Sequence, residues 1–575
     1  MFVKKKLIRG ALFLAVTALL TTAVSIKRVA ADDGPNPFFH FQFQPGTLVL
    51  SRSVYVGTPS MLVPGVTVLP PNCVGGTVSV DLVAGGTTTA TIPTGNGSGG
   101  CSTATADGTF PYVFNNAVSD GNFGITSPIF LDDISTDGWY LGTLPIPTNQ
   151  IVTSFSSKSE LAVHRSTDGK SITFIGYVGG PGYPTGPNLF DVSNSNTPGV
   201  IDPSNPVSSQ YFRSVAEVDA HGNITITNGN AYSGDNGRSV IKGGGFYYMA
   251  GNDNNGNLSK KQLTTTVPGV QLITSTGAEF LVPGQEPPPV PPNVNMIGDF
   301  SVTSICETTV VSGKQTKTCF PADKAGKDNN FRGITIFDNT LYVTKGSGGN
   351  GINTIYQVGT AGTLPTGTTA QLEATPITIP SGFPATLASG VDLNGNPAPV
   401  YYPFGIWFAN ANTLYVCDEG DGTLVSPPVN GNVATTYSQT TSGVQKWVLQ
   451  NGTWNMVYVI NNGLNIGVPY GVPFYPTALN PATDGCRGIT GKVNRDGTVE
   501  IYAVTSTVSP SGDQGADPNK LVKAIDVLDA TSLPSPNNPF SFFLDRFFTL
   551  RTARFGEVFR GVDFAPEDNP NFGDY

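Results

Sequence analysis

A short motif recurs along this chain, and each copy begins a strand–turn–strand pattern. The clearest copies read Phe or Cys, then Arg-Gly, then Ile or Val, and they occupy residues 331–334, 486–489 and 559–562. Looser copies lie at residues 237–240 and 404–406. Each copy continues as an apolar strand, a turn rich in Asn, Asp or Gly, and a second strand. Such units, repeated over hundreds of residues, are typical of radially arranged β-sheets.

The sequence therefore predicts an all-β fold built as a single β-propeller, with no helix outside the N-terminal segment. The expected strands number in the mid-twenties and include residues 300–307 and 316–320. At four strands per blade this number favours seven blades, with six or eight as alternatives. Too little chain follows residues 559–562 to complete a blade. We therefore expect residues 47–56 to pair with this last copy and close the ring, which removes free sheet edges.

The first 31 residues have the three-part form of a secretory signal. Basic residues up to Arg9 precede an apolar run over residues 11–24, and small residues at 29–31 offer a cleavage site before Asp32. The apolar run is shorter than the about 20 residues that a membrane span needs. We expect a secreted or periplasmic protein without a membrane span after cleavage; an uncleaved anchor is the alternative.

Charge limits the classes of partner. The chain has a net charge of −10, and only 13% of its residues are charged. Residues 1–31 hold six basic and no acidic residues, so the mature chain is near −16. A surface of this sign repels phosphate backbones, which excludes nucleic acid as a partner. We expect a monomer that binds an extracellular glycan, a protein or a small polar ligand.

Six cysteines in an exported chain indicate disulfides. Cys73 and Cys101 bracket a loop rich in Gly, Ser and Thr, and we predict that they bridge. Cys306 and Cys319 lie in the two arms of an expected hairpin, and we predict a second bridge there. The other two cysteines lie in neighbouring repeats and are either bridged or free and buried, namely Cys417 and Cys486.

Several stretches between residues 128 and 250 resemble a group of secreted bacterial and plant β-propeller proteins of unassigned function, loosely related to NHL and YVTN propellers. The stretches occur in the expected order at residues 128–138, 144–148, 159–177, 216–227 and 232–241. The later Arg-Gly units fit the same group. This resemblance implies a seven-bladed fold and export, and it brings no catalytic residues with it.

The expected domain organisation follows from these observations. Residues 1–31 are a signal peptide, 32–45 a leader, 46–566 the propeller and 567–575 an acidic tail. Two stretches of the propeller break the repeat, one rich in Gly and Thr and one rich in Pro. We interpret both as long loops, although the second could link two domains. These stretches are residues 70–109 and 283–293.

The arginines of the repeat are the candidates for ligand binding: Arg238, Arg332, Arg487 and Arg560. Each follows a carboxylate three or four residues upstream: Asp235, Asp328, Asp484 and Glu557. If each arginine begins an innermost strand, the four would surround one mouth of the central channel and bind an anionic or sugar-like ligand. We favour the alternative that each pairs with an acid of its own or the next blade and holds the blades together.

Two loops are candidate metal sites. One contains Asp418, Glu419 and Asp421 directly after a strand, and the other contains Asp253 among Asn and Gly residues. Their carboxylate and amide oxygens are of the kind that bind Ca²⁺, the one cofactor that the sequence suggests. The favoured alternative for both loops is a solvated turn. Aromatic residues such as Trp139-Tyr140 could stack on sugar rings, although burial between blades explains most aromatic residues.

Common catalytic motifs are absent from the sequence. The chain has only three histidines and no C-x-x-C, G-x-S-x-G or P-loop motif. We therefore expect a secreted, non-catalytic binding or scaffold propeller that recognises an extracellular ligand. The alternative is an extracellular hydrolase or lyase with a Ca-dependent acidic site at the central channel. The fold alone does not decide between them.

Overall fold

The computed structural model describes much of the chain between residues 41 and 568. The described residues are 41–57, 62–69, 74–81, 87–92, 94, 101–111, 126–155, 157, 160–179, 195–197, 211–252, 269–273, 294–296, 304–311, 314–321, 330–347, 351–392, 395–423, 441–511, 515–534 and 543–568. Residues 42–575 belong to one compact unit. Among the described helices, none has the length and apolar character that crossing a membrane requires.

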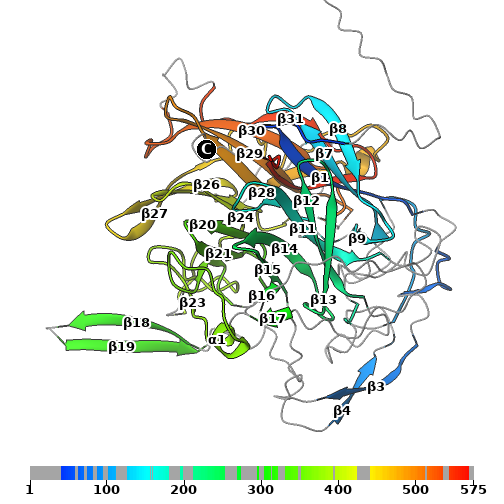
Figure 1. Ribbon diagram of the computed structural model, residues 1–575, viewed down its shortest axis with the longest axis horizontal. Helices are drawn as coiled ribbons and strands as arrows, with labels where there is room; N and C mark the ends of the chain where they lie inside the picture. Colours follow the sequence, from blue (N-terminus) through cyan, green and yellow to red (C-terminus); the bar gives the residue numbers. More distant parts are fainter. Residues whose placement is uncertain are drawn as a thin grey trace, which may run out of the picture. The chain divides into compact units, whose positions relative to one another are not determined.

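Six sheets of four or more strands form the blades of a β-propeller (Figure 1). Blade 1 contains β32 (Glu557–Phe564), β1 (Leu48–Val54), β7 (Ile129–Ile134) and β8 (Tyr140–Pro145). Blade 2 contains β10 (His164–Arg165), β11 (Ser171–Val178), β12 (Arg213–Asp219) and β13 (Ile224–Gly229), extended by β9 (Ile151–Ser154) and β6 (Thr126–Ser127). Blade 3 contains β14 (Gly237–Gly243), β15 (Phe246–Gly251), β16 (Val270–Ile273) and β17 (Val294–Met296).

The other three blades are regular four-stranded meanders. Blade 4 contains β20 (Ile334–Phe337), β21 (Thr340–Lys345), β22 (Thr354–Val358) and β23 (Ile377–Thr378). Blade 5 contains β24 (Pro403–Asn410), β25 (Thr413–Asp418), β26 (Gly443–Gln450) and β27 (Thr453–Ile460). Blade 6 contains β28 (Ala482–Val493), β29 (Thr498–Val508), β30 (Lys520–Val527) and β31 (Phe548–Thr552).

The innermost strands are β10, β14, β20, β24, β28 and β32. Each contacts the innermost strand of the blade before it and of the blade after it, and β32 contacts both β28 and β10. The ring of blades is therefore closed. Every copy of the repeated motif lies in or directly before one of these strands.

The described residues form six blades, one of the two alternatives to the favoured seven. The number of blades is lower than expected because some strands that were counted toward blades form separate two-stranded sheets. Residues near 300–320 form β18 (Ser304–Val311) and β19 (Lys314–Pro321), which pair only with each other and stand apart from the blades in Figure 1. Two further two-stranded sheets join β2 (Val68–Leu69) to β5 (Ser102–Thr103) and β3 (Gly76–Asp81) to β4 (Thr87–Ile92).

Within the described part of the chain, two short helical turns lie outside the sheets, where the sequence predicted no helix. Helix α1 (Thr369–Glu373) begins with a capping box, in which Thr368 and Gln371 bond each other's backbone amides. The 3-10 turn η4 (Thr477–Leu479) has no side-chain cap. Both are too short to produce the 3.6-residue apolar repeat by which a helix is predicted from sequence.

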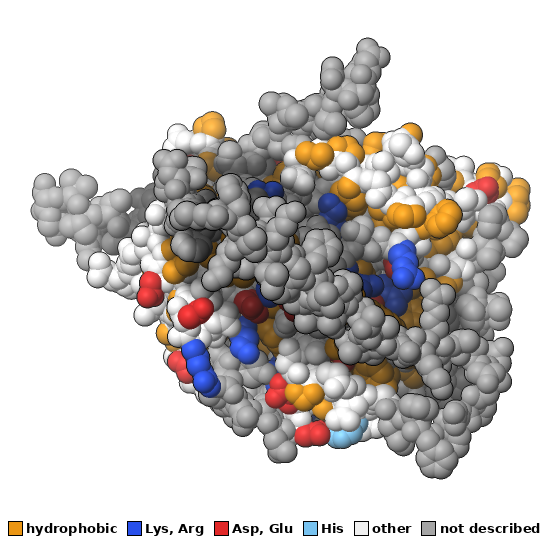
Figure 2. Space-filling view, turned by 90° about the horizontal axis from the view of Figure 1, so that it is seen from above, with side chains coloured by type: hydrophobic (Ala, Val, Ile, Leu, Met, Phe, Trp, Pro, Cys, Tyr) orange, Lys and Arg blue, Asp and Glu red, His pale blue; other side chains and the backbone are white. Residues whose placement is uncertain are grey.

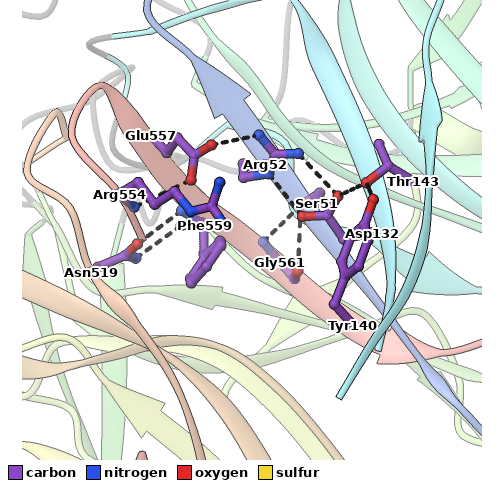
Figure 3. Close-up of polar contacts among 10 residues, drawn as sticks. All are labelled: Ser51, Arg52, Asp132, Tyr140, Thr143, Asn519, Arg554, Glu557, Phe559 and Gly561. Atoms are coloured by element: carbon purple, nitrogen blue, oxygen red, sulfur yellow. Dashed lines mark hydrogen bonds and ion pairs between the residues drawn. The ribbon is translucent and has the colours of Figure 1, made fainter. Parts of the chain in front are cut away.

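Strand β1 closes blade 1, as residues 47–56 were expected to do. It lies between β32 and β7, with Leu50 opposite Val562 on one side and Asp132 on the other. Arg52 strengthens this joint (Figure 3): its Nε and Nη2 donate to the Asp132 carboxylate at 2.8 and 3.0 Å, and its Nη1 donates to Glu557 at 3.0 Å. One side chain thus connects three strands from both ends of the chain.

The glycine of the motif explains why the motif recurs. A Cβ at Gly333 would lie 2.0 Å from the carbonyl oxygen of Phe404 in the next blade, and a Cβ at Gly405 would lie 2.4 Å from that of Arg487. No side chain fits at these distances. At these two positions the motif glycine therefore allows the innermost strands of neighbouring blades to make close backbone contact.

The described residues include one complete disulfide, between Cys417 and Cys486. Cys417 and Cys486 are bridged between blades 5 and 6 and both are buried, which decides between the two alternatives for them. Cys306 and Cys319 lie directly opposite each other in the β18–β19 register. Cys101 is disulfide-bonded, whereas Cys73, its predicted partner, lies outside the described residues. These two predicted bridges stay predictions.

Candidate functional site

All four candidate arginines lie at the innermost strands, and all are buried, with 5–6% of each side chain exposed. Arg238, Arg487 and Arg560 lie within β14, β28 and β32, and Arg332 directly precedes β20. All four arginines therefore lie on or directly beside innermost strands. Each arginine, however, has its own set of partners.

Arg560 bonds to neighbouring backbone carbonyls. Its Nη1 donates to the carbonyl of Ser157 at 2.6 Å, its Nη2 donates to the carbonyl of Phe155, and its Nε donates to Ser53 Oγ at 3.1 Å. The upstream acid Glu557, which the spacing suggested as a partner, bonds Arg52 instead. Arg560 therefore connects blade 1 to the chain segment between β9 and β10 of blade 2.

Arg487 forms an ion pair between two blades. Its Nε lies 3.0 Å from Glu419 Oε2, and both side chains are almost fully buried. Asp484, on the same strand, accepts a hydrogen bond from the Gly422 amide of blade 5 at 2.9 Å. Burial, together with the nearby Asp421 and Glu419 carboxylates, raises the pKa of Asp484 to about 7, although Arg487 and the Gly422 amide oppose the shift.

Arg332 is repelled by the guanidinium groups of two other arginines. Burial lowers the pKa of Arg332 well below its usual range, and repulsion from Arg238 and Arg487 adds to this effect. Glu419 and Asp235 offset part of the repulsion. Its Nη2 donates to Ser347 Oγ at 2.6 Å.

Arg238 is also surrounded by charge. Burial lowers its pKa, and Asp235, Glu160 and Glu419 act in the opposite direction. We call the side chains of Arg238, Arg332, Arg487, Glu419, Asp235 and Glu160 the inner charge cluster. It draws on blades 3 to 6 and on the segment between β9 and β10 of blade 2, and three cations and three carboxylates lie within electrostatic range in a desolvated interior.

Of this cluster, the sequence did not point to Glu160. Its carboxylate accepts hydrogen bonds from Tyr177 Oη and, at 2.7 Å, from Asn236 Nδ2. Leu161, beside it, has a φ of +66°, a conformation that a branched side chain rarely adopts. Blade 2 has no Arg-Gly motif, so no repeat marked this position.

The candidate metal loops are only partly described. Asp418 accepts hydrogen bonds at 3.0 Å from the amides of Tyr402 and Gly420 and from the Gln445 side chain. Burial raises its pKa to about 7 despite these bonds. Within the described residues, no three His, Cys, Asp or Glu side chains are grouped to hold a metal ion. Asp253 lies outside those residues.

Comparisons with known proteins show little. The sequence matches no known protein-family model and no curated protein. Among solved structures, a tryptophan-to-alanine mutant of the Synechocystis apocarotenoid oxygenase is similar at 9% identity and a TM-score of 0.27, over 92% of this chain and 98% of its own. An "ACO/RPE65 chimera" is similar at 9% identity and a TM-score of 0.21; the match covers 77% of this chain and 59% of the chimera. Such values transfer no property to this chain.

Proposed function

We propose that this protein is an exported, non-catalytic binding propeller that takes a small anionic or acidic, polyhydroxylated ligand at the inner charge cluster. The observation that carries the proposal is that Arg332 is buried and repelled by both Arg238 and Arg487. Guanidinium groups gathered in a desolvated site repel one another, and an added carboxylate or sulfate group would relieve that repulsion. Arginine also matches such groups with two parallel hydrogen bonds.

The four arginines divide into two groups under this proposal. Arg560 and Arg487 use their donors on a neighbouring segment and a neighbouring blade, which supports a role in stability. Arg238 and Arg332 are the arginines whose pKa burial lowers, and repulsion from neighbouring guanidinium groups lowers that of Arg332 further; we assign ligand recognition to these two.

Other features support binding over hydrolysis. The Asp418 carboxylate accepts bonds from two backbone amides, an arrangement that stabilises a turn. The secretory form of residues 1–31 and the low charge content support export. The resemblance to secreted propellers agrees with this assignment, and we retain the expectation of a monomer that does not bind nucleic acid.

A panel of ligands tests the proposal. Glucuronate, galacturonate, sulfate and glucose would be titrated calorimetrically into the full mature protein at low and high salt. We expect the acidic ligands to bind and glucose to bind weakly, with affinity falling as salt rises. Arg332→Ala should reduce affinity at least about tenfold, and Arg332→Lys should recover part of it because charge returns without the planar fork.

The matched control is Arg495→Ala, which removes an exposed arginine from a turn. Its affinity should equal that of the unchanged protein. The proposal fails if no acidic ligand binds, or if Arg332→Ala binds as tightly as the control. Release of reducing sugar from an acidic oligosaccharide would instead support the hydrolase or lyase alternative.

A further inference from the structure

Large side chains are exposed on the outer strands of blades 1 and 6. Trp139 is 75% exposed, Tyr140 52%, Leu141 48% and Phe548 40%. We call these four residues the β8–β31 platform. Figure 2 looks onto the side of the molecule that is uppermost in Figure 1, where β8 and β31 lie, and it shows hydrophobic side chains exposed among uncharged ones.

The platform is continuous across the two blades. A Cβ at Gly138 would lie 3.0 Å from Leu550 Cβ, so the turn before β8 packs directly on β31. Arg551 of β31 donates to the Gly138 carbonyl at 3.3 Å, and its guanidinium lies 5.7 Å from the centre of the Tyr140 ring. Gly138 and Tyr140 of blade 1 therefore pack against β31 of blade 6.

Tyr140 is held in place although its ring is half exposed. Its hydroxyl lies 2.7 Å from Thr143 Oγ1, which donates to Asp132. Asp132 in turn accepts both bonds from Arg52 at the closure of blade 1 (Figure 3). An exposed ring whose polar end is fixed by a part-buried network loses little conformational entropy when a ligand stacks on it.

The size and edge of the platform argue against a protein partner. At roughly 200 Å² per large side chain, its four residues expose on the order of 400 Å². This is about half of the 800 Å² that each partner of a stable protein complex buries. Strand β8 also carries a bulge near Tyr140 and ends in Pro145, and both features disfavour the addition of a foreign strand.

We propose that the β8–β31 platform binds a neutral polysaccharide chain, with sugar rings stacked on Trp139 and Tyr140. The carbon–hydrogen faces of sugars pack on aromatic rings, and Trp offers the largest face. Asp137, exposed two residues before Trp139, and Arg551 supply one carboxylate and one guanidinium for sugar hydroxyl groups. Lys523, which donates to the Thr136 carbonyl, forms an ion pair with Glu500, so the charges beside the platform balance and it suits a neutral polymer better than an acidic one. The site is independent of the inner charge cluster.

The test uses the full mature protein with microcrystalline cellulose, chitin and xylan as solid probes. We expect the protein to bind at least one of them. Trp139→Ala should weaken that binding at least about tenfold, because exposed Trp side chains dominate contacts of this kind. Tyr140→Phe keeps the ring but releases its anchor, and should weaken binding about threefold. The matched control is Phe474→Ala, which removes a 92% exposed ring elsewhere and should bind normally.

Fluorescence gives a readout at the site itself. Of the four tryptophans, Trp139 is exposed, whereas Trp447 and Trp454 are 4% and 7% exposed and Trp407 is half-buried. Soluble oligomers of the bound polysaccharide should protect the protein from acrylamide quenching, and Trp139→Ala should abolish this protection. The proposal is overturned if none of the three probes binds, if Trp139→Ala binds as the control does, or if sedimentation shows dimers that Trp139→Ala abolishes. Unchanged polysaccharide binding by Arg332→Ala would separate this site from the proposed function.

Discussion

At the scale of single residues, one motif position has different partners in different blades. Arg487 pairs with a carboxylate of the preceding blade, whereas Arg560 donates to two carbonyls and a hydroxyl. The sequence motif marked these arginines as equivalent positions at strands. The glycine that follows them recurs because the backbone of the next blade approaches it closely, as at Gly333. The partners of the arginines were not predictable, since Phe155 and Arg560 are 405 residues apart in the sequence.

The ion pair of Arg487 gives a stability prediction. Arg487→Ala leaves Glu419 buried without its nearest cation, and breaking a buried pair in this way costs about 3 kcal/mol of unfolding free energy. Arg560→Ala should cost a similar amount, because two carbonyls lose their donors. Chemical denaturation of both variants measures these losses, with exposed Arg495→Ala expected within about 0.5 kcal/mol of the parent protein. An unchanged midpoint for Arg487→Ala would refute the locking role.

At the scale of strands, a buried polar network joins blades 5 and 6. Lys446 of β26 lies 3.0 Å from Asp526 of β30, and the hydroxyls of Tyr415 and Tyr458 both donate to the same carboxylate. Asp545, just before β31, shares a hydrogen bond with Asp526. Burial and the Asp526 carboxylate raise the pKa of Asp545 to about 8, although Lys446 opposes the shift.

This shift predicts a pH dependence. Asp545 is protonated in the folded chain and ionised in the unfolded chain between about pH 4 and pH 8, so the unfolding free energy falls as pH rises through this window. Asp545→Asn keeps a donor towards Asp526 and removes one titrating group. As pH rises, the unfolding free energy of the variant should fall less steeply than that of the parent protein, with slopes that differ by up to about 1.4 kcal/mol per pH unit. Thermal melting from pH 4 to pH 9 measures this slope, and exposed Asp529→Asn is the control. Equal slopes in both variants would contradict the prediction.

The strands also show where sequence reasoning reaches its limit. Alternation and turn residues predicted paired strands near 300–320, and β18 and β19 are indeed a hairpin. Whether a hairpin joins a blade depends on contacts with distant strands, which no local pattern reports, so the favoured count of seven was one too high for the described residues. Closure was predictable because the last motif copy visibly lacked partners. Among the charged residues, Glu160 was missed because blade 2 carries no motif.

At the scale of the whole molecule, the ring depends on a strand from near the N-terminus. Strand β1 pairs with β32 and β7 along its length, and Leu48, Val49 and Leu50 are fully buried. Each such side chain contributes about 1.5–3 kcal/mol through burial. The sum for the three side chains is comparable to the whole unfolding free energy of an ordinary protein, which is about 5–15 kcal/mol.

Two truncations therefore have different expected outcomes. A chain that begins at residue 42 retains β1 and the whole compact unit, and should melt at the temperature of the parent protein. A chain that begins at residue 57 leaves β32 and β7 with facing unpaired edges, which pair readily with other chains. We expect it to aggregate or to melt far below the first truncation, as measured by light scattering and calorimetry. If it stays monomeric with an unchanged melting temperature, the blades hold their ring without the joint that β1 and β32 form.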